Sequence, residues 1–181
     1  VLRPTYICGP GDHTDRFSYR PIRTRKGGQM HWPGSPDDNV QIIDVRDLAN
    51  FTVDCLDREI HGTYNMVSAH SYSMGRLRED CRAVTAASVD PIWIDADFLE
   101  SRGLAGGRDF PTWHGSDGFA ELSTDRAVRA GMHNRPERET ARDLLTWWDT
   151  LPAERTASTR AGLSPEKEAE VLAAWKALGI N

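Results

Sequence analysis

The six histidines of the chain are the first candidates for chemistry, because imidazole binds metal ions and exchanges protons near neutral pH. They contain no HxH, HExxH or HxxxH spacing, and the three cysteines form no CxxC pattern. The one compact group of metal-ligating residue types, Asp12-His13-Thr14-Asp15, is typical of a turn that caps a helix. The sequence therefore predicts no metal site.

Motifs for nucleophilic catalysis and nucleotide binding are also missing from the sequence. It contains neither the GxSxG elbow of a serine hydrolase nor a P-loop. Gly9-Pro10-Gly11 and Gly27-Gly28 are isolated turn glycines, unlike the GxGxxG phosphate cradle that follows a strand. No tyrosine is followed by a lysine four residues later. The motifs therefore indicate no complete active site, and no catalytic residue is assigned.

Four basic residues lie close together around a predicted helix: Arg20, Arg23, Arg25 and Lys26. Guanidinium groups bind phosphate oxygens in pairs, so an anion site is one interpretation. A charge run on a helix is more often a solvated face, and we favour that interpretation.

The composition is that of an ordinary globular protein of 181 residues, with 39% hydrophobic and 27% charged residues. A formal net charge of -5 gives no basic field for nucleic acid. No apolar run approaches the roughly 20 residues that a membrane-spanning helix needs. Three widely spaced cysteines, Cys8, Cys55 and Cys81, suit a reducing compartment. We therefore expect a cytoplasmic protein that binds neither nucleic acid nor membrane.

Hydrophobic periodicity and turn residues predict strands that alternate with helices, which is typical of an α/β fold. The predicted strands are 1–7, 29–32, 40–45, 62–67 and 90–95. The predicted helices are 14–26, 48–56, 73–86, 97–102, 124–130, 136–148 and 164–178, and the rest of 96–119 is irregular. Residues 150–163 read as a polar linker. The chain thus divides into a body, 1–150, and a linker with a docking helix, 151–181.

The first residues read as the end of a buried strand. Val1-Leu2 and Tyr6-Ile7-Cys8 are apolar, Pro4 interrupts them, and a sharp turn follows at Gly9-Pro10-Gly11. The chain has no Met and no polar residues before this strand. We expect a fragment of a longer polypeptide, and a self-contained product is the alternative.

Four stretches in order carry a resemblance to a known family. LRPTYICGPGD is similar to a strand and turn of the form RPxNVYGPG, and VQIIDVRDLANFTVDCLD to RDFIHVxDVAxAxxxAL. GTYNMVSAHSYSMGRLREDCRAVT is similar to GxxYNIGxGxxxSxxEL, and STDRAVRAGMHNRPERETARDLLTWW to SKAxxxLGWxPxxxxxxGLxxTxxW. Together they run from Val1 to about Asp149. They resemble the C-terminal half of the extended short-chain dehydrogenase/reductases, the NAD-dependent epimerase/dehydratase-like family.

The resemblance implies the C-terminal part of an NAD(P)-binding Rossmann fold together with the small substrate-binding α/β subdomain. In the family, the upstream half holds a GxxGxxG turn and a catalytic Ser/Thr with a YxxxK pair, and neither occurs here. The resemblance therefore implies that an N-terminal Rossmann half is missing and that this half would bind most of the NAD or NADP. Alone, the chain is expected to be inactive and to bind dinucleotide poorly. A homodimer is left open.

The resemblance also assigns residues to the cofactor. The strand carrying Pro4, Tyr6 and Ile7 would lie beside the nicotinamide ring, where apolar groups keep water away from hydride transfer. Proline suits this place because it has no backbone N–H and a fixed φ. The alternative for these three residues is a plain core strand and its turn.

The helix after the turn would line the substrate cleft in such an enzyme. The resemblance makes Asp15, Arg16, Tyr19 and Arg20 candidates for contact with a small-molecule substrate. The alternative is that these side chains are simply exposed on the surface.

One departure from the family bears on the substrate. Nucleotide-sugar members have an Arg at the start of RDFIHV, where it pairs with the diphosphate, and this chain has Val40 there. An aliphatic side chain cannot neutralise a pyrophosphate, so Arg46 or Arg126 would have to do so. We therefore expect the substrate-binding half of an NAD(P)-dependent oxidoreductase acting on a small carbonyl or hydroxyl compound. The alternatives are a nucleotide-sugar epimerase or dehydratase, and a non-catalytic binding module.

Overall fold

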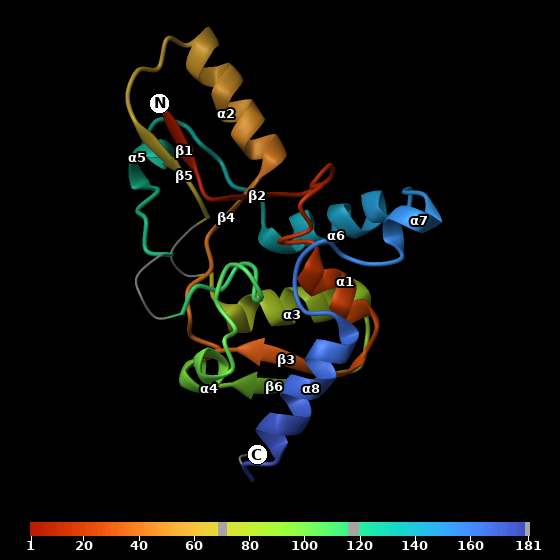
Figure 1. Cartoon of the computed structure of the whole chain (residues 1–181). Helices are drawn as coiled ribbons and strands as arrows, with labels where there is room; N and C mark the ends of the chain where they lie inside the picture. The colour runs from red at the N-terminus through yellow and green to blue at the C-terminus, as the bar shows by residue number, and fades with distance from the viewer. Residues whose placement is uncertain (69–71, 116–119, 180–181) are drawn as a thin grey trace.

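The computed structural model describes residues 1–68, 72–115 and 120–179 (Figure 1). Its strands form three parallel pairs: β1 (Leu2–Pro4) with β5 (Tyr64–Met66), β2 (Tyr6–Cys8) with β4 (Ile42–Asp44), and β3 (Gly28–Pro33) with β6 (Val89–Ile94). Parallel strands need crossover connections, which are usually helices. The predicted α/β class is therefore confirmed.

The helices lie close to their predicted positions. They are α1 (Tyr19–Arg25), α2 (Val45–Asp57), α3 (Met74–Thr85), α4 (Ala96–Ser101), α5 (Asp125–Arg129), α6 (Glu137–Trp148), α7 (Ala153–Thr156) and α8 (Pro165–Lys176). Serine side chains cap two of these helices: the hydroxyls of Ser73 and Ser164 accept hydrogen bonds from the backbone N–H groups of Arg76 and Lys167. The part of the predicted irregular stretch at 116–119 lies outside the described residues.

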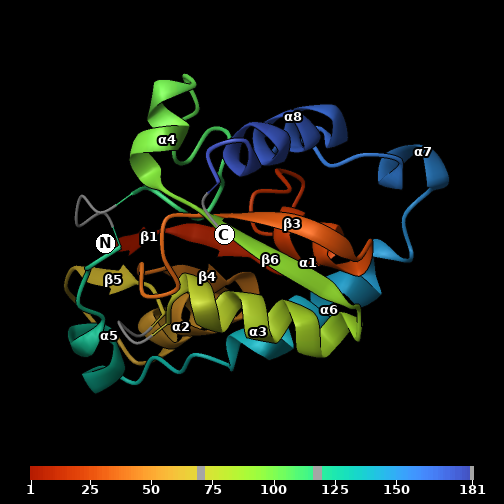
Figure 2. The same ribbon diagram turned by 90° about the horizontal axis from the view of Figure 1, so that it is seen from below.

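Two hydrophobic cores divide the molecule. The smaller one joins β5 to α2 through Ile43, Phe51 and Tyr64, and these elements lie around β1 at the N-terminal end in Figure 1. The larger one is built around Trp32, Leu77 and residues of α6 and α8. In Figure 2, α8 lies on one side of the β3–β6 pair and α3 on the other. The β3–β6 pair is thus covered on both faces, as parallel strands usually are.

Three boundaries were predicted wrongly. The first strand is two strands, because β1 pairs with β5 while β2 crosses to β4, with Thr5 between them. The helix predicted from residue 14 begins at Tyr19, since Asp15 has a left-handed φ of 59° that a helix cannot contain. The predicted linker contains α7 and packs against the body, with Leu163 in the larger core.

A buried carboxylate joins α8 to β3 in the larger core. Glu168 accepts hydrogen bonds from Nδ1 of His31 at 2.8 Å and from Nε of Arg23 at 2.5 Å. Burial lowers the pKa of His31 to about 4, so the ring is a neutral donor at pH 7. Burial alone would raise the pKa of Glu168, but its hydrogen bonds with His31 and Arg23 outweigh this effect and lower it to about 2.

We predict that this pair makes the fold acid-labile. Both pKa values are lowered on folding, so the unfolded chain binds more protons and stability falls as the pH falls. The loss from His31 runs from about pH 6.5, its ordinary pKa, to about pH 4, and that from Glu168 starts near pH 4.5. Urea unfolding at a series of pH values should show a slope in this range that His31→Asn flattens. The exposed His133→Asn variant is the control, and an equal slope in both variants would contradict the assignment.

Candidate functional site

A polar cluster forms around Tyr6, the first residue of β2. The hydroxyl of Tyr6 lies 2.7 Å from Nε2 of His114, and Cζ of Arg16 lies 4.8 Å from the centre of the Tyr6 ring. Burial raises the pKa of the Tyr6 phenol, and Arg16 opposes this rise. Burial also lowers the pKa of His114. The cluster thus combines a phenol, an imidazole and a guanidinium just beyond the carboxyl end of β1. Ligands of α/β folds commonly bind beyond the carboxyl ends of parallel strands.

The Gly-Pro-Gly turn gives this cluster its shape. Gly9 has a φ of 110°, a backbone conformation that strains any residue with a side chain, and a Cβ there would lie only 3.2 Å from Oδ2 of Asp44. Farther along, the Asp12 carboxylate accepts hydrogen bonds from the backbone N–H and the hydroxyl of Thr14. The loop is thereby fixed from both ends and directs Arg16 over Tyr6.

The predicted cofactor residues lie at an apolar edge next to this cluster. Pro4 is exposed, and the side chain of Ile7 is 39% exposed at the end of β2. Tyr6 is half-buried, and its side chain leaves the strand on the side opposite to Ile7, because neighbouring residues of a strand alternate. The cofactor contact of these three residues stays a prediction.

The predicted substrate residues are not gathered at one place. Arg16 is exposed and reaches Tyr6, whereas Asp15 is fully buried. Asp15 accepts hydrogen bonds from Nη2 of Arg155 at 2.5 Å and from the backbone N–H of Arg160 at 2.8 Å. The carboxylate of Asp15 therefore holds residues 155–160 against the loop.

Arg20 and Tyr19 are also buried within the fold. Nη1 of Arg20 donates to the carbonyl of His31 at 3.0 Å, and its Cζ lies 4.9 Å from the centre of the Trp32 ring. Burial lowers the pKa of Arg20 and raises that of Tyr19 to about 12. Gly162 packs directly on the Tyr19 ring. Of the four predicted residues, Arg16 alone joins the Tyr6 cluster, and the substrate roles stay predictions.

Sequence reasoning missed His114, Arg155 and Arg160. His114 lies 108 positions from Tyr6, and Arg155 lies 140 positions from Asp15. Nothing in the local sequence of these residues marks them, because histidine and arginine in irregular segments are usually exposed. Only the tertiary packing brings them to the loop.

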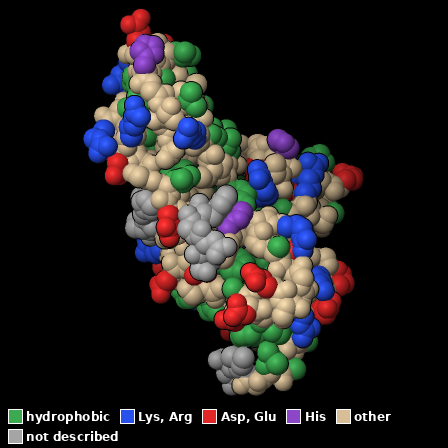
Figure 3. All heavy atoms as spheres, turned by 60° about the vertical axis from the view of Figure 1, so that its left-hand side comes forward, with side chains coloured by type: hydrophobic (Ala, Val, Ile, Leu, Met, Phe, Trp, Pro, Cys, Tyr) green, Lys and Arg blue, Asp and Glu red, His purple; other side chains and the backbone are tan. Residues whose placement is uncertain are grey.

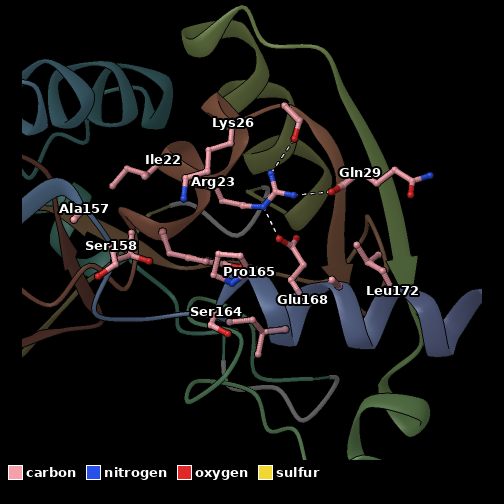
Figure 4. Close-up of a pocket in the computed structure, with 16 residues that line it drawn as sticks. Ile22, Arg23, Lys26, Gln29, Ala157, Ser158, Ser164, Pro165, Glu168 and Leu172 are labelled. Carbon is pink, nitrogen blue, oxygen red and sulfur yellow. Dashed lines mark hydrogen bonds and ion pairs between the residues drawn. The ribbon is translucent and has the colours of Figure 1, made fainter.

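A groove of about 620 Å³ lies between α1 and the segment that leads into α8 (Figure 4). Its volume lies within the range of small-molecule sites. Arg23 crosses it and uses its whole guanidinium on Glu168 and on the carbonyls of Gly27 and Gln29. Arg25 pairs with Asp149. Of the three arginines of the basic run, Arg23 is therefore fully engaged and Arg25 is already paired.

On the face drawn in Figure 3, basic side chains are interspersed with acidic ones. Among the described residues, no three His, Cys, Asp or Glu side chains come together in a way that would hold a metal ion. Within the same residues, every helix is too short or too polar to cross a bilayer.

Several solved structures have a fold similar to that of this chain. The chain is similar to WbmF of Bordetella bronchiseptica in complex with NAD+, with 15% identity and a TM-score of 0.59 over 96% of this chain and 50% of that one. It is similar to RMD of Pseudomonas aeruginosa complexed with NADPH, with 16% identity and a TM-score of 0.57 over 83% and 48% of the two chains. A UDP-glucose 4-epimerase of Thermotoga maritima with UDP-glucose gives 14% identity and a TM-score of 0.58 over 82% and 45%.

These likenesses establish the fold, at identities too low to establish more. No family model and no curated protein matches the sequence. The chain spans about half the length of the solved structures it matches. It has the fold of part of the NAD(P)-binding Rossmann enzymes, and the resemblance drawn from the four sequence stretches is confirmed at this level.

We predict that Asp15 stabilises the loop more than any surface ion pair does. Asp15→Asn leaves Arg155 partly buried without its anion, and breaking a buried pair in this way costs about 3–5 kcal/mol. Asparagine tolerates the left-handed backbone of this position, so the variant tests the charge alone. Urea unfolding at neutral pH measures the loss.

Asp149→Asn is the matched control, because it breaks the exposed pair with Arg25. Its loss should stay below about 1 kcal/mol. Equal losses in the two variants would mean that the Asp15 contact does not hold the loop.

Proposed function

We propose that this chain is the substrate-side half of an NAD(P)-dependent oxidoreductase that acts on a small carbonyl or hydroxyl compound. The observation that carries the proposal is that one short segment of a Rossmann-type fold holds both the exposed apolar residues Pro4 and Ile7 and the polar cluster of Tyr6, Arg16 and His114. A nicotinamide needs such a combination, because its ring lies on apolar groups while the reacting oxygen needs polar ones.

The residues present fit a nicotinamide ring. Pro4 offers no backbone N–H, and Ile7 offers an exposed apolar side chain three residues farther along the chain. When bound, NAD or NADP supplies hydride transfer, and in our proposal a dinucleotide-binding half holds the rest of the cofactor. That half also supplies the Tyr–Lys pair for proton transfer, since no tyrosine of this chain has a lysine four residues later.

The polar cluster would then orient the substrate. The guanidinium of Arg16 is exposed and carries hydrogen-bond donors that suit a carbonyl or carboxyl oxygen. The hydrogen bond to His114 holds Tyr6 in one position. The Tyr6 ring in turn stacks against the Arg16 guanidinium in a cation–π contact. Half-burial of both rings limits the access of water to the cluster.

The residue at the diphosphate position supports a small substrate. Val40 is fully buried, so it faces the core rather than a ligand. Arg46, a substitute considered above, donates from Nε and Nη2 to Asp44 and from Nη1 to Asp143. The other substitute, Arg126, stacks on Tyr64 at 5.3 Å. The Arg46 guanidinium is thus already neutralised, which disfavours a nucleotide-sugar substrate.

The test uses the complete enzyme that we propose, with its dinucleotide-binding half. Loss of NADH or NADPH absorbance is followed with a panel of small aldehydes and ketones, and calorimetry measures binding of a UDP-sugar. We expect turnover with members of the panel and no UDP-sugar binding. Tight UDP-sugar binding would favour the epimerase or dehydratase alternative, and cofactor binding without any turnover would favour the non-catalytic module.

We predict that Ile7→Asp weakens cofactor binding. Loss of the apolar contact and burial of a new carboxylate beside the ring should raise the dissociation constant for NAD(P)H by about tenfold or more. Quenching or enhancement of NAD(P)H fluorescence measures this constant. Leu178→Asp, which charges another exposed apolar residue beyond α8, is the control. An unchanged affinity in Ile7→Asp would remove this strand from the cofactor site.

A further inference from the structure

Two arginines of α3 differ from the other charged residues of that helix. Arg76 pairs with Glu79 at 3.7 Å, and Asp80 pairs with Arg138 at 2.8 Å. In the part of the chain that the structure describes, Arg78 and Arg82 form no ion pair. Four residues apart on a helix, they occupy the same face, where like charges repel each other. The helix therefore carries two positive charges together with no anion to balance them.

Buried hydrogen-bond donors lie beside these arginines. The Trp32 side chain is fully buried, and within the described residues its indole N–H has no acceptor. Nε of Arg78 is also buried without an acceptor. Native proteins leave few buried donors unpaired, and an ion or water often satisfies those that remain. Two such donors at one place indicate a missing acceptor.

The residues that carry both donors line the same small cavity. It measures about 30 Å³ and is enclosed by Thr24, Trp32, Arg78, Arg82, Val89 and Pro91. This volume holds about one water-sized atom. Thr24 is the only one of these residues with a side-chain oxygen, and its hydroxyl donates to the carbonyl of Arg20. An occupant would therefore meet the N–H groups of tryptophan and arginine.

The small cavity adjoins a wider crevice on the surface. The crevice measures about 910 Å³ and shares Arg78, Arg82 and Val89 with the cavity. One acidic residue, Glu79, lines it, and its carboxylate is turned to Arg76. None of the lining residues belongs to the Tyr6 cluster or to the groove beside α8. The place is thus separate from the proposed nicotinamide edge.

We propose that this crevice binds an oxyanion, a phosphate group of a small molecule. One anionic oxygen would enter the small cavity and accept hydrogen bonds from the indole of Trp32 and Nε of Arg78. The rest of the group would stay in the crevice against Arg82, whose guanidinium suits paired binding of phosphate oxygens. Phosphate satisfies the two buried donors and balances both charges of α3 at once. A single water molecule in the cavity would satisfy the donors but would leave the charges unbalanced.

Inorganic phosphate is the probe for the first experiment. The indole N–H resonance of Trp32, assigned by its loss in Trp32→Phe, is followed in ¹H–¹⁵N spectra of the protein during a phosphate titration. We expect a saturable shift of this resonance and a higher melting temperature. Sodium chloride at equal ionic strength and sodium acetate are the comparison ligands. An equal shift with chloride would overturn the oxyanion assignment, and an equal shift with acetate would replace phosphate by a carboxylate.

Paired substitutions test the arginines. The double variant Arg78→Gln with Arg82→Gln should weaken phosphate binding by about tenfold or more, since it removes two charge-assisted contacts. Arg76→Gln, the same change at a paired arginine of the same helix, should bind like the unchanged protein. If the double variant does not fold, the exposed Arg82→Gln alone is used and should also bind more weakly.

Two results would overturn the site. One is the absence of any saturable phosphate shift, which would leave a water molecule as the occupant of the cavity. The other is equal phosphate affinity in the double variant and in Arg76→Gln, which would mean an adventitious ion only.

Discussion

Two buried carboxylates, Asp15 and Glu168, connect the ends of this chain and fix the elements between them. Each carboxylate loses its hydration on folding, and the free-energy cost of this loss is offset because cations and N–H groups take the place of water. Asp15 is met by Arg155 and the backbone of Arg160, and Glu168 by His31 and Arg23. The C-terminal segment is thus joined to the loop after β2 and to β3 by contacts that fail if either side moves.

The candidate site depends on these contacts, although neither carboxylate belongs to it. The loop between β2 and α1 is held by the hydrogen bond of Asp12 within the loop and by the Asp15–Arg155 pair, which joins it to α7. Arg155 is itself stacked on Trp148 of α6 at 4.7 Å, so the position of the loop is tied to a long helix. Arg16 projects from this loop over Tyr6. A guanidinium on a loop that is fixed in this way loses less conformational freedom on binding a ligand than one on a free loop.

The sequence predicted most of the secondary structure and little of the site. Strand and helix alternation, the serine caps and the helix at Pro165 follow from local patterns, because periodicity and capping act over a few residues. The helix predicted from residue 14 does not include Asp15, which has a left-handed backbone. Its carboxylate accepts a hydrogen bond from Arg155, which lies 140 positions farther along the chain, so the local sequence could not reveal this contact. Residues 150–163 were predicted to be a linker because they are polar. Their contacts with the distant loop at Asp15 leave no signal in the local sequence. His114 was found only through its contact with Tyr6.

The two cores differ in how well they are covered, and this difference bears on the proposed function. The β3–β6 pair has helices on both faces and needs nothing more. The β1–β5 and β2–β4 pairs have two short strands each, and a two-stranded pair is marginal without further packing.

Apolar side chains are exposed beside these two pairs. Val1 and Ile7 are exposed along the strands, and the neighbouring α2 exposes Val53 and Leu56. Parallel strands are normally buried on both faces, so a group of exposed apolar residues at this end is what a surface shaped for another protein layer would show. The half of the molecule with complete cover is the one that carries α8, and the half with open apolar surface is the one that carries the proposed nicotinamide edge. This asymmetry supports the proposal that the half with the β1–β5 and β2–β4 pairs is completed by a dinucleotide-binding partner.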